Sequence, residues 1–200
     1  MIYGSTRVVG VIGNPVEHTA SPAMHNAAIK EMGLDYVYVA FRVGHAELSE
    51  AIEGIRALNI AGTNVTVPHK KAVMAYLDDV SPEAKAIGAV NTIVNKDGKL
   101  IGHNTDAFGF TKSVDLEGTF KKWPQTVVLL GAGGAARAVL FALLQRPEVE
   151  RIHLINRTMV RAELLANEMD SEGRVYTGSM SDGEWAEVGL LINSTSVGLF

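Results

Sequence analysis

The segment VVLLGAGGAARAVLFALL, residues 127–144, decides the fold of the second half of the chain. An apolar run typical of a buried strand leads into a glycine turn and then into an apolar helix. The turn fits the pattern G-x-G-x-x-A, with Gly131, Gly133 and Ala136 at the fixed positions. The first glycine permits a tight turn, the second lets the backbone approach a pyrophosphate, and the small third residue lets the helix pack on the strand. Free N–H groups at such a helix start bind phosphates, so the segment predicts a Rossmann-type, dinucleotide-binding unit.

The next strand and helix, LINRTMVRA at 154–162, predict which dinucleotide binds. An NAD site places Asp or Glu at the end of this strand, where the carboxylate accepts a hydrogen bond from the ribose 2′-hydroxyl. This segment has no carboxylate, and Arg157 and Arg161 can pair with a 2′-phosphate instead. The alternative is that both are solvated arginines, although cations at a helix N-terminus oppose the helix dipole. We therefore predict NADP rather than NAD.

Outward from this segment, strands alternate with helices along the whole chain, which predicts an α/β fold with mostly parallel strands. Ser21 is the expected N-cap of the first helix, and Asp97-Gly98 is a strong two-residue turn signal inside a hairpin over 89–104. The predicted strands are 8–13, 36–43, 62–67, 126–132, 151–156, and segments near 174–178 and 190–194. The predicted helices are 21–33, 45–59, 70–79, a short piece over 81–88, 106–117, 134–146 and 159–169. The break near 104–106 predicts two domains, 1–104 and 105–200.

The composition limits the class of protein. The chain has 200 residues, of which 47% are hydrophobic and 20% charged, enough for a sizeable core in one or two domains. A net charge of -4 gives no basic field for nucleic acid. Without cysteine there is no disulfide and no thiolate metal site, and we expect no metal. The N-terminus does not resemble a signal peptide, and no run of 18 apolar residues occurs, so we expect a soluble, cytoplasmic protein with no membrane contact.

Polar residues of the first hundred positions fall where strands end and loops begin. Because ligands of an open α/β sheet bind at the carboxyl ends of its strands, these side chains can converge on one cleft. Hydroxyls and amides dominate, which suits a small ligand with several hydroxyl groups. The alternative for Ser21, Thr105 and Asp106 is a role as simple helix caps. The residues are Thr19, Ser21, Asn64, Thr66, Lys70, Asn91, Thr92, Asn104, Thr105 and Asp106.

The chain resembles the shikimate dehydrogenase family, NADP-dependent enzymes of aromatic amino-acid biosynthesis. Seven segments match the landmarks of that family in order, and they extend along nearly the whole chain. Only the glycine-rich loop is shared with unrelated dehydrogenases. The segments are GNPVEHTASPAMHNAA (13–28), NVTVPHKK (64–71), GAVNT (88–92), DGKLIGHNTDAFG (97–109), GAGGAARAV (131–139), NRTMVRA (156–162) and INSTSVG (192–198).

The resemblance implies a role for each matching residue. Lys70 corresponds to the catalytic lysine and Asp106 to the acid that partners it, whereas the adjacent Lys71 points elsewhere and is solvated. The resemblance implies an N-terminal substrate domain followed by an NADP-binding domain, and reversible reduction of 3-dehydroshikimate to shikimate. The implied substrate ligands are Thr19, Ser21, Asn64, Thr66, Asn91 and Asp106. The implied cofactor ligands are Gly131, Ala132, Gly133, Gly134, Ala135, Asn156, Arg157, Thr158, Arg161, Thr195 and Ser196.

The sequence departs from the family in two places. Thr19 replaces a serine. Its hydroxyl can still donate, but its methyl group stiffens χ1 and crowds the site, so we expect a modest loss of affinity or none. The chain stops at STSVGLF, where the family continues for roughly another third of this length, which leads us to expect an incomplete cofactor domain with exposed apolar surface. We expect a monomer or a homodimer. The alternatives are an NAD-dependent quinate/shikimate dehydrogenase, a non-catalytic shikimate- or dinucleotide-binding module, and a more distant dehydrogenase acting on folate.

Overall fold

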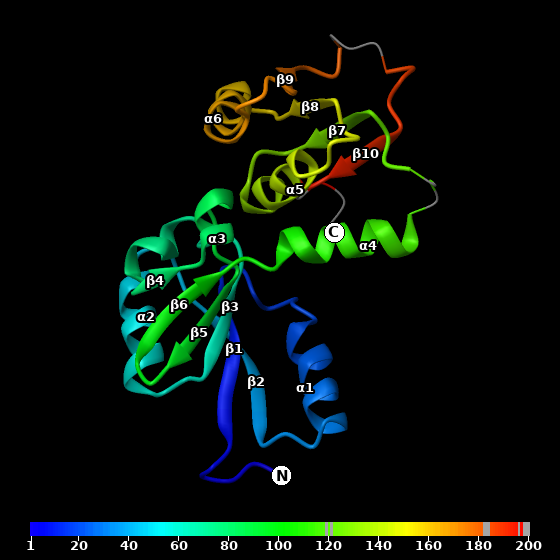
Figure 1. Cartoon of the computed structure of the whole chain (residues 1–200). Coiled ribbons are helices and arrows are strands. Elements are labelled where there is room, and N and C mark those ends of the chain that lie inside the picture. The colour runs from blue at the N-terminus through cyan, green and yellow to red at the C-terminus, as the bar shows by residue number, and fades with distance from the viewer. Residues whose placement is uncertain (119, 121, 182–184, 196, 198–200) are drawn as a thin grey trace. The chain divides into compact units, whose positions relative to one another are not determined.

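The computed structural model describes residues 1–118, 120, 122–181, 185–195 and 197. The backbone forms two compact units, Met1–Asn104 and Thr105–Phe200. Each unit has its own sheet and its own hydrophobic core (Figure 1).

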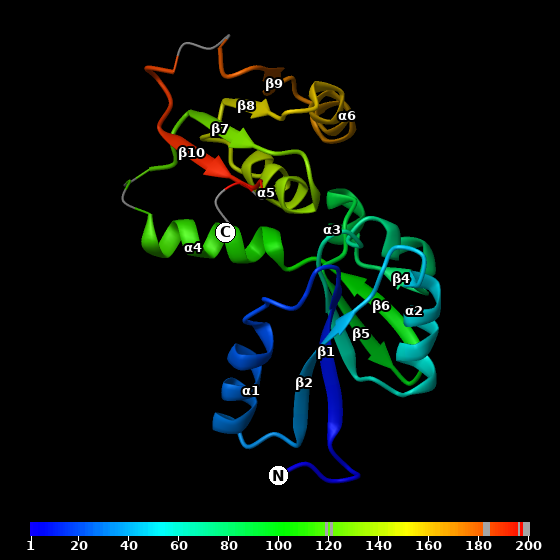
Figure 2. The same cartoon turned by 180° about the vertical axis from the view of Figure 1, so that it is seen from behind.

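The first unit is built on a six-stranded mixed sheet of order β2-β1-β3-β5-β6-β4. Its strands are β1 (Arg7–Gly13), β2 (Tyr36–Arg42), β3 (Gly62–Val65), β4 (Asp79–Val80), β5 (Thr92–Lys96) and β6 (Lys99–His103). Its helices are α1 (Ser21–Glu31), α2 (Leu48–Ala57), the 3-10 turn η1 (Ala72–Tyr76) and α3 (Pro82–Ile87). The chain runs from β1 through α1 to β2 and returns through α2 to β3, and the two helices lie on opposite sides of these strands (Figures 1 and 2). The connection that leaves β1 and the connection that enters β3 therefore run on opposite sides of the sheet. Open α/β sheets bind ligands at such positions.

The core of the first unit lies between α2 and the sheet. Leu48, Ile52 and Ile55 of α2 keep helical spacing and are buried against strand residues such as Val65 and Ile93. The helix α1 has no buried residue at all. It is therefore held to the sheet by other contacts than a hydrophobic face.

The second unit has an entirely parallel sheet of order β10-β7-β8-β9. Its strands are β7 (Thr126–Leu130), β8 (Arg151–Ile155), β9 (Val175–Gly178) and β10 (Leu190–Asn193), and its helices are α4 (Asp106–Glu117), α5 (Gly134–Leu144) and α6 (Met159–Met169). Read from β9, this is the order 3-2-1-4 of a Rossmann half, with the reversal between β7 and β10. The predicted α/β class is confirmed, including the Rossmann-type arrangement of the second unit.

Two element predictions are wrong. Residues 70–79 do not form a helix but only the turn η1, because the next residues pair with β6: Asp78 N–H donates to the Leu100 carbonyl, and Leu100 N–H donates to the Asp78 carboxylate at 2.7 Å. The short strand β4 that follows was not predicted. Ser21 is not the N-cap of α1 but its first residue, since the capping position is Ala20 and has no side-chain hydrogen bond.

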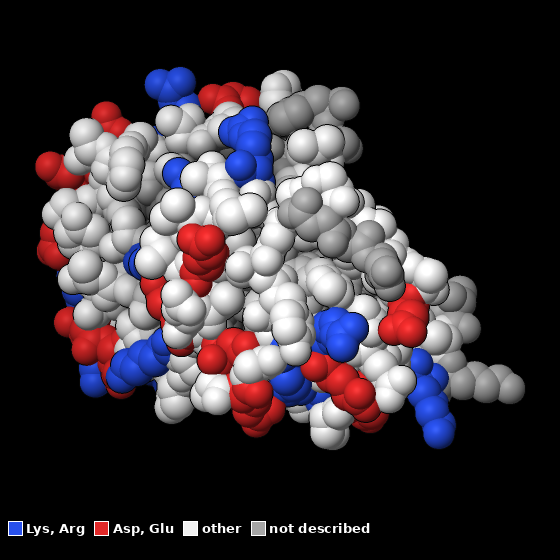
Figure 3. Space-filling model, turned by 90° about the horizontal axis from the view of Figure 1, so that it is seen from above, with Lys and Arg blue, Asp and Glu red and all other residues white. Residues whose placement is uncertain are grey.

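On one face of the molecule, charges of both signs are mixed. On the face shown in Figure 3, lysines and arginines are interspersed with aspartates and glutamates. In the described part of the chain, no helix is long and apolar enough to cross a membrane.

Candidate active site

Six predicted site residues of the first unit lie along the edge of its sheet that is formed by strand ends, not by an outer strand. β1, β3 and β6 end at this edge, and β5 begins there because it runs antiparallel to β3 and β6. Thr92, the first residue of β5, is the register partner of Asn64 near the end of β3. The edge thus collects groups from segments far apart in sequence, as predicted for a cleft at the strand ends. They are Thr19, Ser21, Asn64, Thr66, Lys70 and Asn91.

The backbone at Lys70 is fixed at this edge by its neighbours. Val90 N–H donates to the Lys70 carbonyl at 2.8 Å, which places the lysine beside the segment that carries Asn91. The preceding residue, His69, is fully buried, and its Nε2 donates to the Val43 carbonyl at 2.8 Å. A carbonyl only accepts, so this bond fixes the proton on Nε2. Lys70 is half-buried, whereas Lys71 is exposed.

The Thr66 hydroxyl is available to a ligand. Its backbone is held by bonds to Ile12 and His69, and the side chain is half-buried. Within the described residues, its hydroxyl makes no hydrogen bond. A half-buried hydroxyl at a strand end without a protein partner is suited to bind a polar ligand.

Thr19 and Ser21 form a hydroxyl pair. Thr19 Oγ1 donates to Ser21 Oγ at 3.1 Å and accepts from the Ser21 backbone N–H at 3.3 Å. Both side chains are half-buried. Two adjacent hydroxyls can both turn their protons toward one anionic group, which is the chemistry needed to hold a carboxylate.

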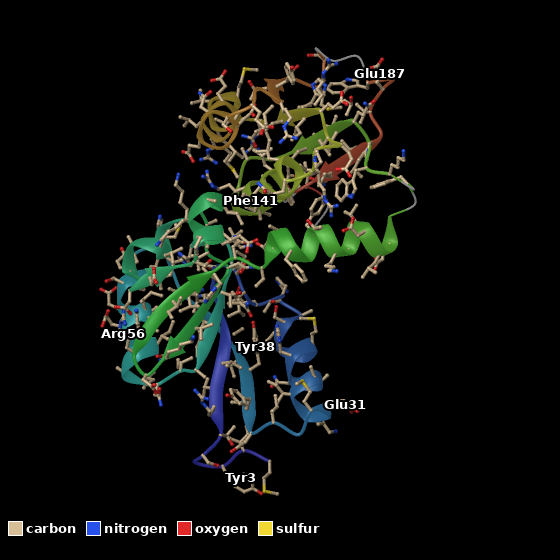
Figure 4. All side chains as sticks on the ribbon, in the orientation of Figure 1. Tyr3, Glu31, Tyr38, Arg56, Phe141 and Glu187 are labelled. Atoms are coloured by element: carbon tan, nitrogen blue, oxygen red, sulfur yellow. The ribbon has the colours of Figure 1, made fainter. Side chains whose placement is uncertain are left out.

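Tyr38, which no sequence motif marks, contacts the predicted site residue Asn64. The residue is 4% exposed, and its hydroxyl donates to Asn64 Oδ1 at 2.7 Å. Burial raises the pKa of the Tyr38 phenol, and a hydrogen bond from Ser21 partly offsets that rise. Figure 4 labels Tyr38 on β2, the strand against which α1 packs. The signal in sequence was weak, because a tyrosine inside an apolar strand is ordinarily a core residue whose hydroxyl finds some partner.

Asp106 is the first residue of α4 in the second unit. It is half-buried, and the positive end of the helix dipole favours a carboxylate there. The described residues contain no cluster of three side chains suited to hold a metal ion.

The glycine loop after β7 has the geometry of a phosphate site. Gly131 has φ +111°, and a Cβ there would lie 2.7 Å from Ser194 Oγ, so only glycine fits. At Gly133 a Cβ would meet no atom of the described residues within 4 Å, so they leave the space beside the backbone open. α5 begins at Gly134 without a side-chain cap, and no described group accepts from the backbone N–H of Gly134 or Ala135. A pyrophosphate fits these free donors, and the buried Ala136 lets α5 pack closely on the sheet.

The predicted 2′-phosphate residues follow β8 as a group. Arg157, Thr158 and Arg161 are all exposed, and Asn156 Nδ2 donates to the Thr158 carbonyl at 2.8 Å, which shapes the turn. Neither arginine has an ion-pair partner among the residues that the structure describes. Two cations without a carboxylate nearby suit a phosphate rather than a ribose hydroxyl.

The loop after β10 lies at the same edge of the second sheet. Ser194 Oγ donates to the Leu130 carbonyl at 2.6 Å, at the end of β7. Thr195 is held in a turn by Asn193 Oδ1, which accepts from the Thr195 hydroxyl at 2.6 Å. Ser196, the other predicted ligand, lies outside the described residues.

Comparison with known proteins gives consistent matches for both units. Residues 11–93 match the family model described as the shikimate dehydrogenase substrate binding domain, and residues 117–198 match the model described as shikimate / quinate 5-dehydrogenase. A curated relative, shikimate dehydrogenase (NADP(+)) of Symbiobacterium thermophilum, is 47% identical over 98% of this chain and 68% of its own length.

Two solved structures resemble the whole chain. A shikimate dehydrogenase in complex with NADP+ has a TM-score of 0.88 and 45% identity, and the match covers 99% of this chain and 69% of that one. A shikimate 5-dehydrogenase from Listeria monocytogenes in complex with shikimate and NAD has a TM-score of 0.87 and 38% identity, over 99% and 71% of the two chains. The chain thus spans about 70% of the length of these relatives.

Proposed function

The chain belongs to the shikimate dehydrogenase family, and from that premise we propose how its residues carry out the reaction. It is an NADP-dependent oxidoreductase that interconverts 3-dehydroshikimate and shikimate. We place this step in aromatic amino-acid biosynthesis and in the cytoplasm. That the protein acts as a monomer or a homodimer stays a prediction.

The chemistry requires a hydride and a proton at the C3 carbonyl. Bound NADPH supplies the hydride, and negative charge then develops on the carbonyl oxygen. As an ammonium, Lys70 stabilises that oxygen and donates the proton that completes the alcohol. In the reverse direction neutral Lys70 takes the proton from the C3 hydroxyl. We assign Asp106 as the second member of this acid–base pair, which orients the lysine and binds a hydroxyl of the substrate.

Two further groups of residues bind the ligands. The hydroxyls of Thr19 and Ser21 hold the substrate carboxylate, and amide and hydroxyl side chains bind the ring hydroxyls. The second group comprises Asn64, Thr66, Asn91 and Asp106. The cofactor is held at its pyrophosphate by Gly131–Ala135 and at its 2′-phosphate by Asn156, Arg157, Thr158 and Arg161, with Thr195 and Ser196 lining the site.

The role of Lys70 rests on one observation: its backbone is fixed beside the Asn91 segment at the edge that collects the hydroxyl and amide groups. We predict that Lys70→Ala lowers turnover by about 10²- to 10⁴-fold, the usual contribution of a general acid–base, while shikimate still binds. Turnover is followed by NADPH absorbance, and shikimate binding by titration calorimetry. Near-normal turnover in this variant would refute the assignment.

Lys71→Ala is the matched control, because it removes the same charge from the adjacent, exposed position. Its turnover should stay within about twofold of the parent, as for most surface substitutions. Equal losses in both variants would mean that the positive charge of the segment matters and not an acid–base at Lys70.

A second cofactor, NAD, is favoured by one observation, since the Listeria relative was solved with NAD. Our assignment of NADP rests on the curated NADP-dependent relatives and on the arginines after β8. Parallel assays with the two cofactors distinguish them.

A further inference from the structure

We propose that Tyr38 and Thr92 are positioning residues for shikimate, because their hydroxyls hold the side-chain amides of two predicted substrate ligands, Asn64 and Asn91, in one row of hydrogen bonds. This rests on the proposed function, which identifies the ligand. The members of this hydrogen-bonded row, in order, are Tyr38, Asn64, Thr92 and Asn91. The members other than Tyr38 and Thr92 are predicted to touch the substrate.

The orientation of Asn64 follows from its neighbours. Its Nδ2 lies 3.4 Å from the Asn91 carbonyl, a group that only accepts, so this end of the side chain must be the donor. Oδ1 therefore faces the Tyr38 hydroxyl at 2.7 Å and accepts its proton. A flipped amide would set two acceptors, Oδ1 and the Asn91 carbonyl, against each other. Tyr38 thus locks the amide in a single orientation toward the substrate.

Thr92 fixes the orientation of the second side-chain amide, that of Asn91. Its Oγ1 accepts from Asn64 Nδ2 at 3.3 Å and donates to Asn91 Oδ1 at 2.9 Å. The Nδ2 end of Asn91 is thereby directed away from Thr92. With Asn64 and Thr92 in register across β3 and β5, one hydroxyl orders two amides on neighbouring strands.

The predicted carboxylate pair follows beyond Tyr38. Because the Tyr38 proton points to Asn64, the phenol oxygen can accept from the Ser21 hydroxyl, the group that partly offsets the rise in the phenol pKa. Thr19 in turn donates to Ser21 at 3.1 Å. Both hydroxyls can rotate their protons onto an incoming carboxylate without moving a heavy atom, while Tyr38 stays hydrogen-bonded to Asn64. The row therefore keeps the amides ordered before and after the ligand binds, which is preorganisation of the site.

Removing one hydroxyl tests the row. In Tyr38→Phe the ring keeps its stacking on His25, with ring centroids 4.2 Å apart, but Asn64 Oδ1 loses its donor. We expect the Kd for shikimate to rise about three- to tenfold, the effect of one lost hydrogen bond, with the Kd for NADP⁺ changed by less than about twofold. Tyr36→Phe is the matched control: it lies on the same strand, and its hydroxyl accepts from the exposed Arg7 at 2.9 Å. Both constants should stay unchanged there.

Thr92→Val removes the second link, with Thr63→Val as its control on the neighbouring strand. Thr63 is 3% exposed, and its hydroxyl has no hydrogen-bond partner among the described residues, so its removal should leave the Kd for shikimate unchanged and should not lower the melting temperature. Thr92→Val should raise the Kd for shikimate about three- to tenfold. If both links act through one row, the double variant Tyr38→Phe/Thr92→Val should lose less than the product of the single losses.

The outcomes separate the row from the function itself. If the parent chain does not bind shikimate, the proposed function fails. If it binds, but Tyr38→Phe keeps the parent Kd, the row has no role and the inference is overturned. A rise in the Kd values for shikimate and NADP⁺ together with a melting temperature well below that of Tyr36→Phe would show a role in folding alone, and would also overturn it.

Discussion

Arg157 is the residue to which we attribute the preference for NADP over NAD. It is exposed immediately after β8, and the described structure gives it no ion pair. We predict that Arg157→Ala weakens NADP⁺ binding by about 10- to 100-fold, the range for hydrogen bonds to a charged group, and weakens NAD⁺ binding by less than about twofold. Titration of both cofactors measures this. Arg151→Ala, at the opposite end of the same strand, is the control and should change neither constant.

At the residue scale, the sequence indicates candidate groups that stand alone in a motif, and it gives no signal for candidates that are defined by a distant partner. Lys70, Thr66 and Gly131 follow strands whose ends could be read directly. Tyr38 could not be identified in this way, because the role that we infer for it depends on a hydrogen bond to Asn64, which lies 26 residues further along the chain. His69 was missed for the same reason, since its bond to Val43 exists only in the folded chain. Pairings between distant segments are set by tertiary structure.

At the scale of elements, α1 is attached to the sheet by polar contacts. Asn26 donates to the Tyr38 carbonyl at 2.8 Å and accepts from the Tyr38 N–H at 2.9 Å. β2 is the outermost strand at this side of the sheet, so Asn26 also satisfies backbone groups of an open edge. With no buried residue of its own, α1 depends on this clamp to hold Ser21 in place.

We therefore predict that Asn26→Ala destabilises the chain by about 1–3 kcal/mol, because it leaves backbone groups of Tyr38 unpaired, and also raises the Kd for shikimate. Urea unfolding and shikimate titration measure the two effects. Met24→Ala, an exposed position of the same helix, should alter neither. Unchanged stability in Asn26→Ala would show that other contacts hold α1.

The elements themselves were predicted well where local signals agree. The short helix predicted over 81–88 is present as α3: Ser81 caps it by accepting from Ala84 N–H at 3.2 Å, and Gly88 ends it at φ +69°. The segment 70–79 failed because its helical composition competed with strand pairing at Asp78 and Asp79, and the tertiary contact prevailed. Local propensity is a weak guide where a neighbouring strand offers hydrogen bonds.

At the scale of the whole molecule, the two units can be observed separately. The chain has two tryptophans, Trp123 and Trp185, and both belong to the second unit. Tryptophan fluorescence therefore reports unfolding of that unit, while circular dichroism reports both. This matters because each unit has its own core, so a single melting temperature need not describe the chain.

The second unit should lose stability in mild acid through His153. Burial and then the Arg151 charge lower the pKa of His153 in the folded chain. The unfolded chain thus binds the proton more readily, so stability is complete above the unfolded pKa of about 6.5 and falls as the pH drops below it. We predict that the fluorescence melting temperature falls between about pH 7.5 and about pH 5.5, and that His153→Gln reduces this fall. Arg151→Ala should reduce the fall in melting temperature less than His153→Gln does. A fall in His153→Gln equal to that of the parent chain would contradict the prediction.

The anchoring of the Lys70 backbone has a consequence for the speed of proton transfer. The residue lies between buried His69 and the Val90 bond, and Val73 N–H donates back to the His69 carbonyl at 2.9 Å, so the segment cannot swing as a loop does. The ammonium can change position only by torsions of its own side chain. Such rotations take picoseconds to nanoseconds, whereas loop motions take up to microseconds. If Lys70 is the acid–base group, as we propose, its movement is therefore not expected to limit turnover.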